Sequence, residues 1–406
     1  MVVAEINTVT GGSTGKIMLD IARIARRNGI EVYTFSSRIY RKNMNIDYKS
    51  IENHFYYGSI MSSFLHKCFG RLLGLNGFFS IFSTISLVKK LKQLKVDTIH
   101  LHNIHDFCIN LPILFRYITH NNISVIWTLH DCWTYTGHCP YYTVAKCNKW
   151  MYGCGRCPQK SVNPRTVLDT THLMWKVKRH LFLGIDKLTI VTPSEWLSQE
   201  VSKSFLKDRT IKVIHNGIDL SIFRPQESDI RRKYNIMDKY VILGVASGWD
   251  PRKGIDVFIT LADLLDPNIY KIILVGTDVN IDNDLPECII SIHRTNNQNE
   301  LAQLYTLANV FVNPTREDNY PTVNMEAIAC GTPVVTFNTG GSPEMIGDNT
   351  GCVLNNEDIS SLISAIERIR KEDPYSREGC VQYARKFDKT ICFNQYSKLY
   401  LSQPRK

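Results

Sequence analysis

Two acidic residues stand where the chain could bind a charged ligand. Asp318 lies in a polar loop after an apolar strand, and Glu326 lies eight positions later on an otherwise apolar helix that starts near Pro321. Ligands bind at the carboxyl edge of an α/β sheet, so both carboxylates can face one site. Glu326 taken alone could be a solvated helix residue, but its apolar neighbours favour a carboxylate with a polar partner.

Basic residues and a glycine-rich turn could bind an anion. Arg252 and Lys253 precede a glycine, and on their own they indicate only solvated surface charge. Gly11 and Gly12 lie in a turn between a strand and an apolar-periodic helix, whose N-terminal amides favour an anion. The turn is not a phosphate-binding P-loop, because three residues rather than four separate its outer glycines and Ile17 follows the lysine. An ordinary tight turn explains the glycines equally well.

Histidines follow two of the predicted strands. His130 follows the strand at residues 125–129, and His100, His102 and His105 lie at the end of the preceding strand. Imidazole titrates near neutrality, which suits proton transfer or hydrogen bonding beside a reacting group. Each of these histidines could instead be a hydrogen-bonded structural residue, and the three earlier ones compete with His130 for any chemical role.

Five of the twelve cysteines cluster between residues 132 and 157. Four thiolates, from Cys139, Cys147, Cys154 and Cys157, could close a tetrahedral structural zinc site. An iron–sulfur cluster also needs only cysteine ligands, and reduced, unligated thiols are the third alternative. The same insertion, about residues 132–160, carries aromatic residues that suit either stacking on a ligand or packing in a core: Trp133, Tyr135, Tyr141, Tyr142, Trp150 and Tyr152.

The apolar pattern predicts two scaffolds to position these residues. Short apolar strands alternate with helices at 2–9, 31–35, 98–101, 125–129 and 188–192, and again at 241–246, 271–275, 310–312 and 333–337. This alternation is typical of parallel sheets. Turn residues and a proline between 213 and 225 indicate a linker. We therefore predict an α/β protein with two doubly wound, Rossmann-like domains, 1–215 and 216–387, and a C-terminal helix at about 388–406 that packs back on the first.

Composition limits the class of partner. The 406 residues carry a formal charge of +10, but the basic residues are dispersed, so an anionic substrate or a membrane surface explains the excess. The chain lacks the roughly 20 consecutive apolar residues of a spanning helix, and its start does not resemble a secretory signal, so we expect a cytoplasmic protein. Residues 55–91 combine apolar pairs with basic residues, and we favour helices packed on their own domain over helices lying on a membrane.

Several motifs together resemble glycosyltransferase family 4, a family of retaining enzymes with the GT-B fold. The family's donor-binding signature has two acidic residues eight positions apart; this register assigns the first role to Asp318, an Asp in place of the common Glu, and the second to Glu326. The resemblance covers nearly the whole chain and includes further motifs: Gly11-Gly12, Thr128-Leu129-His130-Asp131, Asn216-Gly217-Ile218-Asp219, Arg252-Lys253-Gly254 and Thr339-Gly340-Gly341-Ser342-Pro343-Glu344.

The resemblance implies a role for each matching residue. Two facing domains hold the donor in the cleft between them. Lys253, assisted by Arg252, contacts the donor diphosphate, and Glu326 holds the ribose. Asp318 touches the donor sugar, and His130 lies beside the reacting carbon, which places it ahead of the other histidines. Family members often carry an arginine five positions before the lysine, where this chain has Gly248.

We therefore expect a retaining glycosyltransferase that uses a nucleoside diphosphate sugar and no catalytic metal ion. The resemblance implies a glycan or lipid-linked acceptor, a setting in bacterial surface-polysaccharide assembly, and peripheral membrane contact without nucleic acid. Two alternatives stay open. A nucleotide-sugar epimerase of the same fold needs no acceptor, and a metal-dependent nucleic-acid-binding protein would explain the positive charge and the cysteines.

Overall fold

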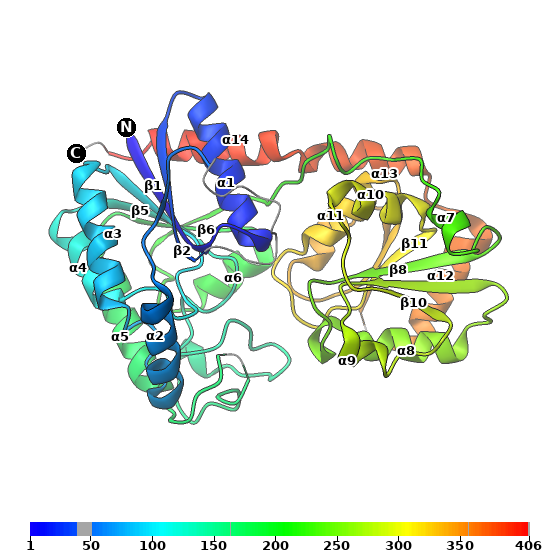
Figure 1. Ribbon diagram of the computed structural model, residues 1–406, viewed down its shortest axis with the longest axis horizontal. Helices are drawn as coiled ribbons and strands as arrows, with labels where there is room; N and C mark the ends of the chain where they lie inside the picture. Colours follow the sequence, from blue (N-terminus) through cyan, green and yellow to red (C-terminus); the bar gives the residue numbers. More distant parts are fainter. Residues whose placement is uncertain (39–50, 163, 356, 405–406) are drawn as a thin grey trace. The chain divides into compact units, whose positions relative to one another are not determined.

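The chain folds into two compact units. The computed structural model describes residues 1–38, 51–162, 164–355 and 357–404. One unit comprises Met1–His215 together with Phe393–Lys406, and the other comprises Asn216–Cys392. In each unit, helices cover a parallel β-sheet (Figure 1). The predicted α/β class with two doubly wound domains is confirmed.

The first unit contains a seven-stranded parallel sheet in the order β3-β2-β1-β4-β5-β6-β7. All five predicted strands are present. The two additional strands, β3 and β7, lie at the edges of the sheet and are partly exposed, so they lack a continuous apolar run. The strand bounds are β1 Val2–Val9, β2 Glu31–Arg38, β3 His54–Tyr56, β4 Thr98–Leu101, β5 Ser124–Thr128, β6 Leu188–Thr192 and β7 Thr210–Val213.

Helices flank this sheet, and α3, α4 and α5 pack side by side (Figure 1). The helix bounds are α1 Gly12–Arg27, α2 Ile60–Leu73, α3 Ile81–Gln93, α4 Leu111–His120, η2 Lys149–Met151, α5 Thr171–Leu183 and α6 Glu195–Ser202. The last helix of the chain, α14 (Lys389–Leu401), begins in the second unit and then packs on the first, where Tyr396 and Tyr400 are buried.

The second unit contains a six-stranded parallel sheet in the order β10-β9-β8-β11-β12-β13. Successive residues of β8 point to opposite faces, so Val241 and Leu243 join one apolar core and Ile242 joins another. The strand bounds are β8 Tyr240–Val245, β9 Tyr270–Val275, β10 Ile289–Ile292, β11 Val310–Asn313, β12 Val334–Phe337 and β13 Gly351–Leu354. The helix bounds are α7 Ile230–Lys233, η3 Pro251–Lys253, α8 Ile255–Leu264, α9 Val279–Asp282, α10 Gln298–Leu307, α11 Thr322–Ala329, η4 Ser342–Met345, α12 Ile359–Glu372, α13 Arg377–Ala384 and η5 Arg385–Phe387.

The strand orders determine where ligands can bind. In the first sheet the direction of winding changes between β1 and β4, and in the second it changes between β8 and β11. Loops that leave such neighbouring strands at their carboxyl ends diverge to opposite faces, and this divergence creates the usual ligand site of an α/β sheet. Gly11 and Gly12 follow β1, Lys253 follows β8, and Asp318 and Glu326 follow β11, whereas His130 and the four cysteines follow β5, the strand next to β4.

The helices α2 and α3 occupy the segment with mixed apolar and basic residues. Only His66 and Gly70 of α2 are buried, whereas Phe64 is 60% exposed and Phe82 of α3 is 85% exposed. The prediction that these helices pack on their own domain therefore agrees with their buried residues, whereas other apolar side chains of both helices are exposed. In the part of the chain that the structure describes, every helix is too short or too polar to cross a membrane.

Candidate functional site

Lys253 and Asp318 form an ion pair at the carboxyl ends of β8 and β11. Lys253 Nζ lies 2.5 Å from Asp318 Oδ2, and the two side chains are 19% and 18% exposed. The structure thus brings together the predicted phosphate-binding lysine and the first predicted acidic residue. A partly buried lysine that already has one carboxylate partner retains two further N–H donors for an anionic ligand.

Local structure holds Lys253 at this position. Asp250 caps the short helix η3, and its carboxylate accepts a 2.9 Å hydrogen bond from the Lys253 amide. Gly254 follows with φ 77°, and a Cβ atom there would lie 2.6 Å from the Pro314 carbonyl oxygen. Only glycine fits this close approach, so the glycine of the motif lets the turn after β8 pack against the loop after β11.

Two arginines join the same pair of loops. Arg252 donates from Nη1 to the Glu317 carbonyl at 3.0 Å, so its guanidinium is anchored beside the loop that carries Asp318. Arg316 donates two hydrogen bonds, of 2.8 and 2.7 Å, to the carboxylate of Asp256 at the start of α8. The hydrogen bonds to Asp256 raise the pKa of Arg316. Arg252 therefore remains near Lys253, while Arg316 serves as a structural clamp that the sequence did not reveal.

Glu326 lies on α11 with a polar partner in the unit's interior. The buried Tyr305 hydroxyl, on α10, donates to Glu326 Oε2 at 3.1 Å. This contact agrees with the interpretation of Glu326 as a partnered rather than a solvated carboxylate. Glu326 thus contacts Tyr305, and Asp318 contacts Lys253.

Sequence reasoning missed the residues that fix the Asp318 loop. Gly340 has φ 55°, and a Cβ atom there would lie 1.8 Å from the Asp318 carbonyl oxygen. Buried Asn324 accepts from Asn313 at 2.8 Å and donates to Ser342 at 2.9 Å, which connects β11, α11 and η4. Gly340 and Ser342 belong to a motif noted in the sequence, but only the fold shows which loop they support.

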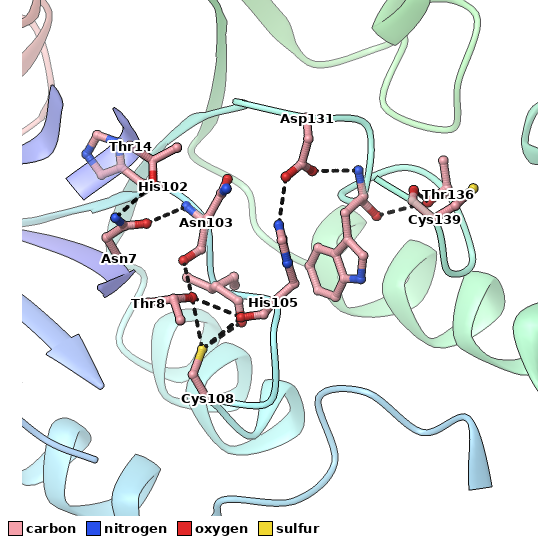
Figure 2. Close-up of polar contacts among 12 residues, drawn as sticks. Asn7, Thr8, Thr14, His102, Asn103, His105, Cys108, Asp131, Thr136 and Cys139 are labelled. Atoms are coloured by element: carbon pink, nitrogen blue, oxygen red, sulfur yellow. Dashed lines mark hydrogen bonds and ion pairs between the residues drawn. The ribbon is translucent and has the colours of Figure 1, made fainter. Parts of the chain in front are cut away.

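The glycine turn of the first unit starts α1 directly after β1. Gly11 is the N-cap residue without a side-chain cap, Gly12 is exposed, and the first turn has no acidic residue. The amides at this helix start therefore remain suited to an anion or a hydroxyl-rich ligand. Asn7 fixes the neighbouring loop, because it donates to Thr14 at 3.2 Å and accepts from the Asn103 amide at 3.0 Å (Figure 2).

His130 is half-buried after β5 and contacts His102, which follows β4. His102 Nδ1 lies 3.0 Å from His130 Nε2, and the two rings stack with an interplanar angle of 11°. On its other side, His102 Nε2 lies 3.4 Å from Glu5 Oε2. Burial, together with repulsion from a protonated His102, lowers the pKa of His130 to about 3. His130 is therefore a neutral imidazole near pH 7, suited to hydrogen bonding rather than to carrying positive charge.

A buried polar cluster stands behind this histidine pair. His100 contacts the Tyr400 hydroxyl at 2.6 Å and Thr128 at 2.8 Å, and the Tyr400 hydroxyl donates to Glu5 Oε1 at 2.9 Å. Burial raises the pKa of Glu5 to about 8, so its protonated form predominates near neutrality. His100 and His102 are fully buried, so they can affect a bound ligand only through neighbouring side chains. Sequence reasoning missed Glu5 and Tyr400, which resemble ordinary strand and helix residues.

His105 pairs with Asp131, the residue after His130. His105 Nε2 lies 2.7 Å from Asp131 Oδ2, and Asp131 Oδ1 accepts from the Trp133 amide at 2.9 Å (Figure 2). Burial alone would lower the pKa of His105, but the charge and hydrogen bond of Asp131 outweigh it and raise the pKa. The first unit thus carries two histidines of opposite character, a neutral His130 and a His105 that favours its cationic form.

The four predicted metal ligands lie around one small cavity of about 20 Å³. Cys139, Cys147, Cys154 and Cys157 all line it. The aromatic residues of the insertion mostly form core, since Trp133, Tyr135, Tyr142 and Trp150 are buried, whereas Tyr152 is exposed. Core packing therefore explains four of the six aromatic residues.

Comparisons with known proteins agree with this arrangement. The family model described as Glycosyltransferase Family 4 matches residues 14–222, about half of the chain, and the model described as Glycosyl transferases group 1 matches residues 226–387. A protein of Escherichia coli K12 named WcaC, assigned to colanic acid biosynthesis as a glycosyl transferase, is 24% identical over 277 residues. Spore coat protein SA of Bacillus subtilis is 24% identical over 223 residues. The matches cover 65% and 46% of this chain, and the chain spans less than two thirds of either relative, 65% and 59%.

Solved structures share the fold over the full length. Sucrose-phosphate synthase of Thermosynechococcus elongatus superposes with a TM-score of 0.72 at 17% identity and covers 98% of both chains. Anabaena Alr3699/HepE, determined in complex with UDP-glucose, superposes with a TM-score of 0.69 at 14% identity and covers 100% of both. The family models match both units, and the two parallel sheets have the architecture of GT-B proteins. The chain therefore belongs to glycosyltransferase family 4 and has the GT-B fold.

Proposed function

We propose that this protein is a retaining glycosyltransferase that moves a sugar from a nucleoside diphosphate sugar to a glycan or lipid-linked acceptor. The observation that carries the proposal is the Lys253–Asp318 pair at the carboxyl ends of β8 and β11, in a chain that matches glycosyltransferase models over both units. Lys253 is the cation for the diphosphate. Asp318, displaced from Lys253 when the phosphates bind, turns its carboxylate to the donor sugar.

The second unit supplies the donor site. Arg252 lies in the same loop as Lys253, and its anchored guanidinium adds a second positive charge for the leaving diphosphate. Glu326 binds the ribose hydroxyls, either in place of its hydrogen bond from the Tyr305 hydroxyl or together with it. The structural neighbour Anabaena Alr3699/HepE is described with UDP and with UDP-glucose, which supports a nucleotide-sugar donor here.

No catalytic metal ion is needed in this proposal. Lys253, Arg252 and the amides at the start of α8 provide the positive field that a divalent cation supplies in other transferases. Turnover should therefore not increase when magnesium or manganese is added.

The first unit supplies the acceptor site. His130 acts at the reacting carbon as a neutral hydrogen-bond partner, held in orientation by His102. The loop with Gly11 and Gly12 contributes amides that suit an anionic group of the donor.

A setting in surface-polysaccharide assembly fits the exposed faces of α2 and α3. Phe64, Leu65, Phe69 and Leu72 of α2 are all at least 45% exposed, with exposed Lys67 and Arg71 among them. Apolar residues flanked by basic residues suit the surface of an anionic membrane. We propose that these helices bring the protein to the cytoplasmic face of the membrane, where a lipid-linked acceptor meets a water-soluble donor.

The test is a product assay with purified protein and a panel of nucleotide sugars, with and without acceptors. Release of nucleoside diphosphate that requires an acceptor, and a product with the anomeric configuration of the donor, support the proposal. Interconversion of the nucleotide sugar without any acceptor would instead identify an epimerase. Salt-dependent nucleic-acid binding with no sugar chemistry would favour the binding-protein alternative.

A further inference from the structure

The insertion between β5 and α5 brings four cysteines and one histidine to a single cavity. Cys139, Cys147, Cys154 and Cys157 lie in irregular parts of this insertion, and His138 lines the same space of about 20 Å³. A space of this size holds one water-sized particle. Four half-buried thiols around one such space resemble a ligand set more than four independent core residues.

The backbone around the cysteines already donates toward sulfur. The Gly137 amide donates to Cys154 Sγ at 3.1 Å. Lys149 Nζ donates to the carbonyls of Gly155 and Arg156, at 3.3 and 2.8 Å, and so holds the turn between Cys154 and Cys157. Amide donors directed at sulfur stabilise thiolates, which are the form of cysteine that binds metals.

Two further side chains indicate that the cavity takes a charged ligand set. His138 is 4% exposed, and its Nε2 has no hydrogen-bond partner among the described residues. Lys178 is fully buried, and its ammonium donates to the Trp133 carbonyl and lies 3.8 Å from the centroid of the Trp133 ring. A cation held by four thiolates leaves a net negative cluster, which supplies an acceptor for His138 and a counter-charge for Lys178.

We propose that this cavity binds one structural Zn²⁺ through the thiolates of Cys139, Cys147, Cys154 and Cys157. Zinc–sulfur bonds of about 2.3 Å in a tetrahedron require sulfur–sulfur distances of about 3.8 Å. Among the described residues, the ligand atoms of Glu5, His100 and His102 all lie within 4.8 Å of one another, whereas no three cysteine sulfurs do. Zinc binding therefore draws the thiols inward and releases their protons. The buried Glu5 group is a less suitable metal site, because both nitrogens of His100 already have hydrogen-bond partners.

The proposed zinc site would stabilise the loop beside His130. Thr136 donates to the Cys139 carbonyl at 2.6 Å, and the Trp133 amide donates to Asp131, the residue that follows His130 (Figure 2). The cysteine turns thus connect through a few hydrogen bonds to the Asp131–His105 ion pair. The zinc ion is structural in this proposal, and the proposal stands whether or not the chain transfers sugars.

The primary test is the metal content of the wild-type chain, purified under reducing conditions without a polyhistidine tag. We expect about one zinc per chain by elemental analysis. After removal of the metal with a chelator, zinc chloride should restore the melting temperature, and cobalt chloride should give the intense thiolate-to-metal absorption of a tetrahedral tetrathiolate site. A folded chain with no stoichiometric metal would overturn the proposal, and so would a chain that contains iron and sulfide.

Variants define the ligand set. Replacing Cys147 or Cys157 with Ser should reduce the zinc content from about one per chain toward zero and lower the melting temperature, because three thiolates leave the site open. Cys288→Ser and Cys352→Ser, at half-buried cysteines in the second unit, are the matched controls and should retain full zinc. His138→Ala should also retain zinc. If His138→Ala loses zinc while Cys147→Ser keeps it, the assignment of four thiolates is wrong. If the cysteine variants do not fold, the metal content and cobalt spectrum of the wild type still decide.

Discussion

His102 Nδ1 lies 3.0 Å from His130 Nε2, so the half-buried histidine after β5 is oriented by a fully buried one after β4. His102 in turn faces Glu5 Oε2 at 3.4 Å. A side chain without solvent access cannot contact an acceptor, so His102 is a positioning residue and not an acceptor-binding one.

His130→Ala should lower kcat by about 100-fold or more and change the donor Kd little, because a group beside the reacting carbon acts mainly on the transition state. His102→Ala should lower kcat less and also leave donor affinity intact. Steady-state kinetics with saturating donor and acceptor, together with calorimetric donor titrations, separate these effects. His120→Ala, at the exposed end of α4, is the control. Near-native turnover of His130→Ala would show that our catalytic assignment is wrong.

Lys253→Ala should weaken binding of both a nucleoside diphosphate and inorganic pyrophosphate by roughly 10-fold, because it removes a charge-assisted hydrogen bond to phosphate. Asp318→Asn removes the anion that competes for Lys253 Nζ. This variant should therefore bind the nucleoside diphosphate at least as tightly as the wild type while it turns over the nucleotide sugar more slowly. Isothermal titration with each ligand measures both effects, and Lys371→Ala on the exposed face of α12 is the control. Equal affinities in wild type and Lys253→Ala would remove the lysine from the donor site.

Glu326→Ala should weaken binding of a nucleoside diphosphate by roughly 10-fold and leave pyrophosphate binding unchanged, because its proposed partner is the ribose. Tyr305→Phe should produce a smaller loss, since it removes only the hydroxyl that donates to Glu326 Oε2. The same titrations check both variants. A loss of pyrophosphate affinity in Glu326→Ala would indicate that the residue supports the phosphate loop instead.

Glu5→Gln should flatten the dependence of stability on pH. Burial raises the folded-state pKa of Glu5 from 4.5 to about 8, so the native chain binds this proton more tightly than the unfolded chain. Below pH 4.5 this glutamate is protonated in both states, so it does not change the free energy of unfolding. As pH rises from 4.5 toward 8, the free energy of unfolding decreases by about 1.4 kcal/mol per pH unit from this group alone.

The measurement is the free energy of unfolding in urea between pH 5 and 8. Glu5→Gln should lose less stability over this range than the wild type, whereas Glu31→Gln, at an exposed position on β2, should follow the wild type. Burial lowers the pKa of His130 to about 3, so this group acts in the opposite direction. Its contribution is complete above pH 6.5 and decreases as pH falls below 6.5, so it overlaps the lower part of the Glu5 window but is the same in Glu5→Gln and in the wild type. Parallel pH curves for Glu5→Gln and the wild type would contradict the buried, protonated state of Glu5.

Replacing Phe64 and Phe69 together with Ser should reduce binding to vesicles of anionic lipid, because it removes exposed apolar area from α2. The same pair of changes should leave the melting temperature nearly unchanged. Sedimentation with vesicles of anionic and of neutral lipid measures the effect. Met237→Ser with Leu264→Ser, two exposed apolar positions in the second unit, is the matched control. Equal vesicle binding by both double variants would show that α2 is not the membrane-binding face.

The amino-acid sequence alone was sufficient to predict both parallel sheets, because buried parallel strands are short apolar runs and nine of them matched observed strands. The edge strands β3, β7, β10 and β13 were not predicted; each is only three or four residues long and partly exposed. Motif spacing also singled out Asp318, Glu326, Lys253, His130 and the four cysteines. Asp318, Glu326, Lys253 and His130 follow strand ends, and the cysteines are clustered in one segment, and both features are visible in the linear sequence.

Only the tertiary structure decided which of these residues meet. Lys253 and Asp318 are 65 positions apart, and Tyr400 reaches Glu5 across 395 positions. The periodicity of apolar residues shows which face of a strand is buried, but it does not show which distant polar group forms a hydrogen bond with a buried polar group. Glu5 therefore resembled an ordinary strand residue until the fold placed His102 and Tyr400 against it. The physical reason is that a buried polar group needs a hydrogen-bond partner, and the order of the strands in a sheet can place a residue from a distant part of the chain beside it.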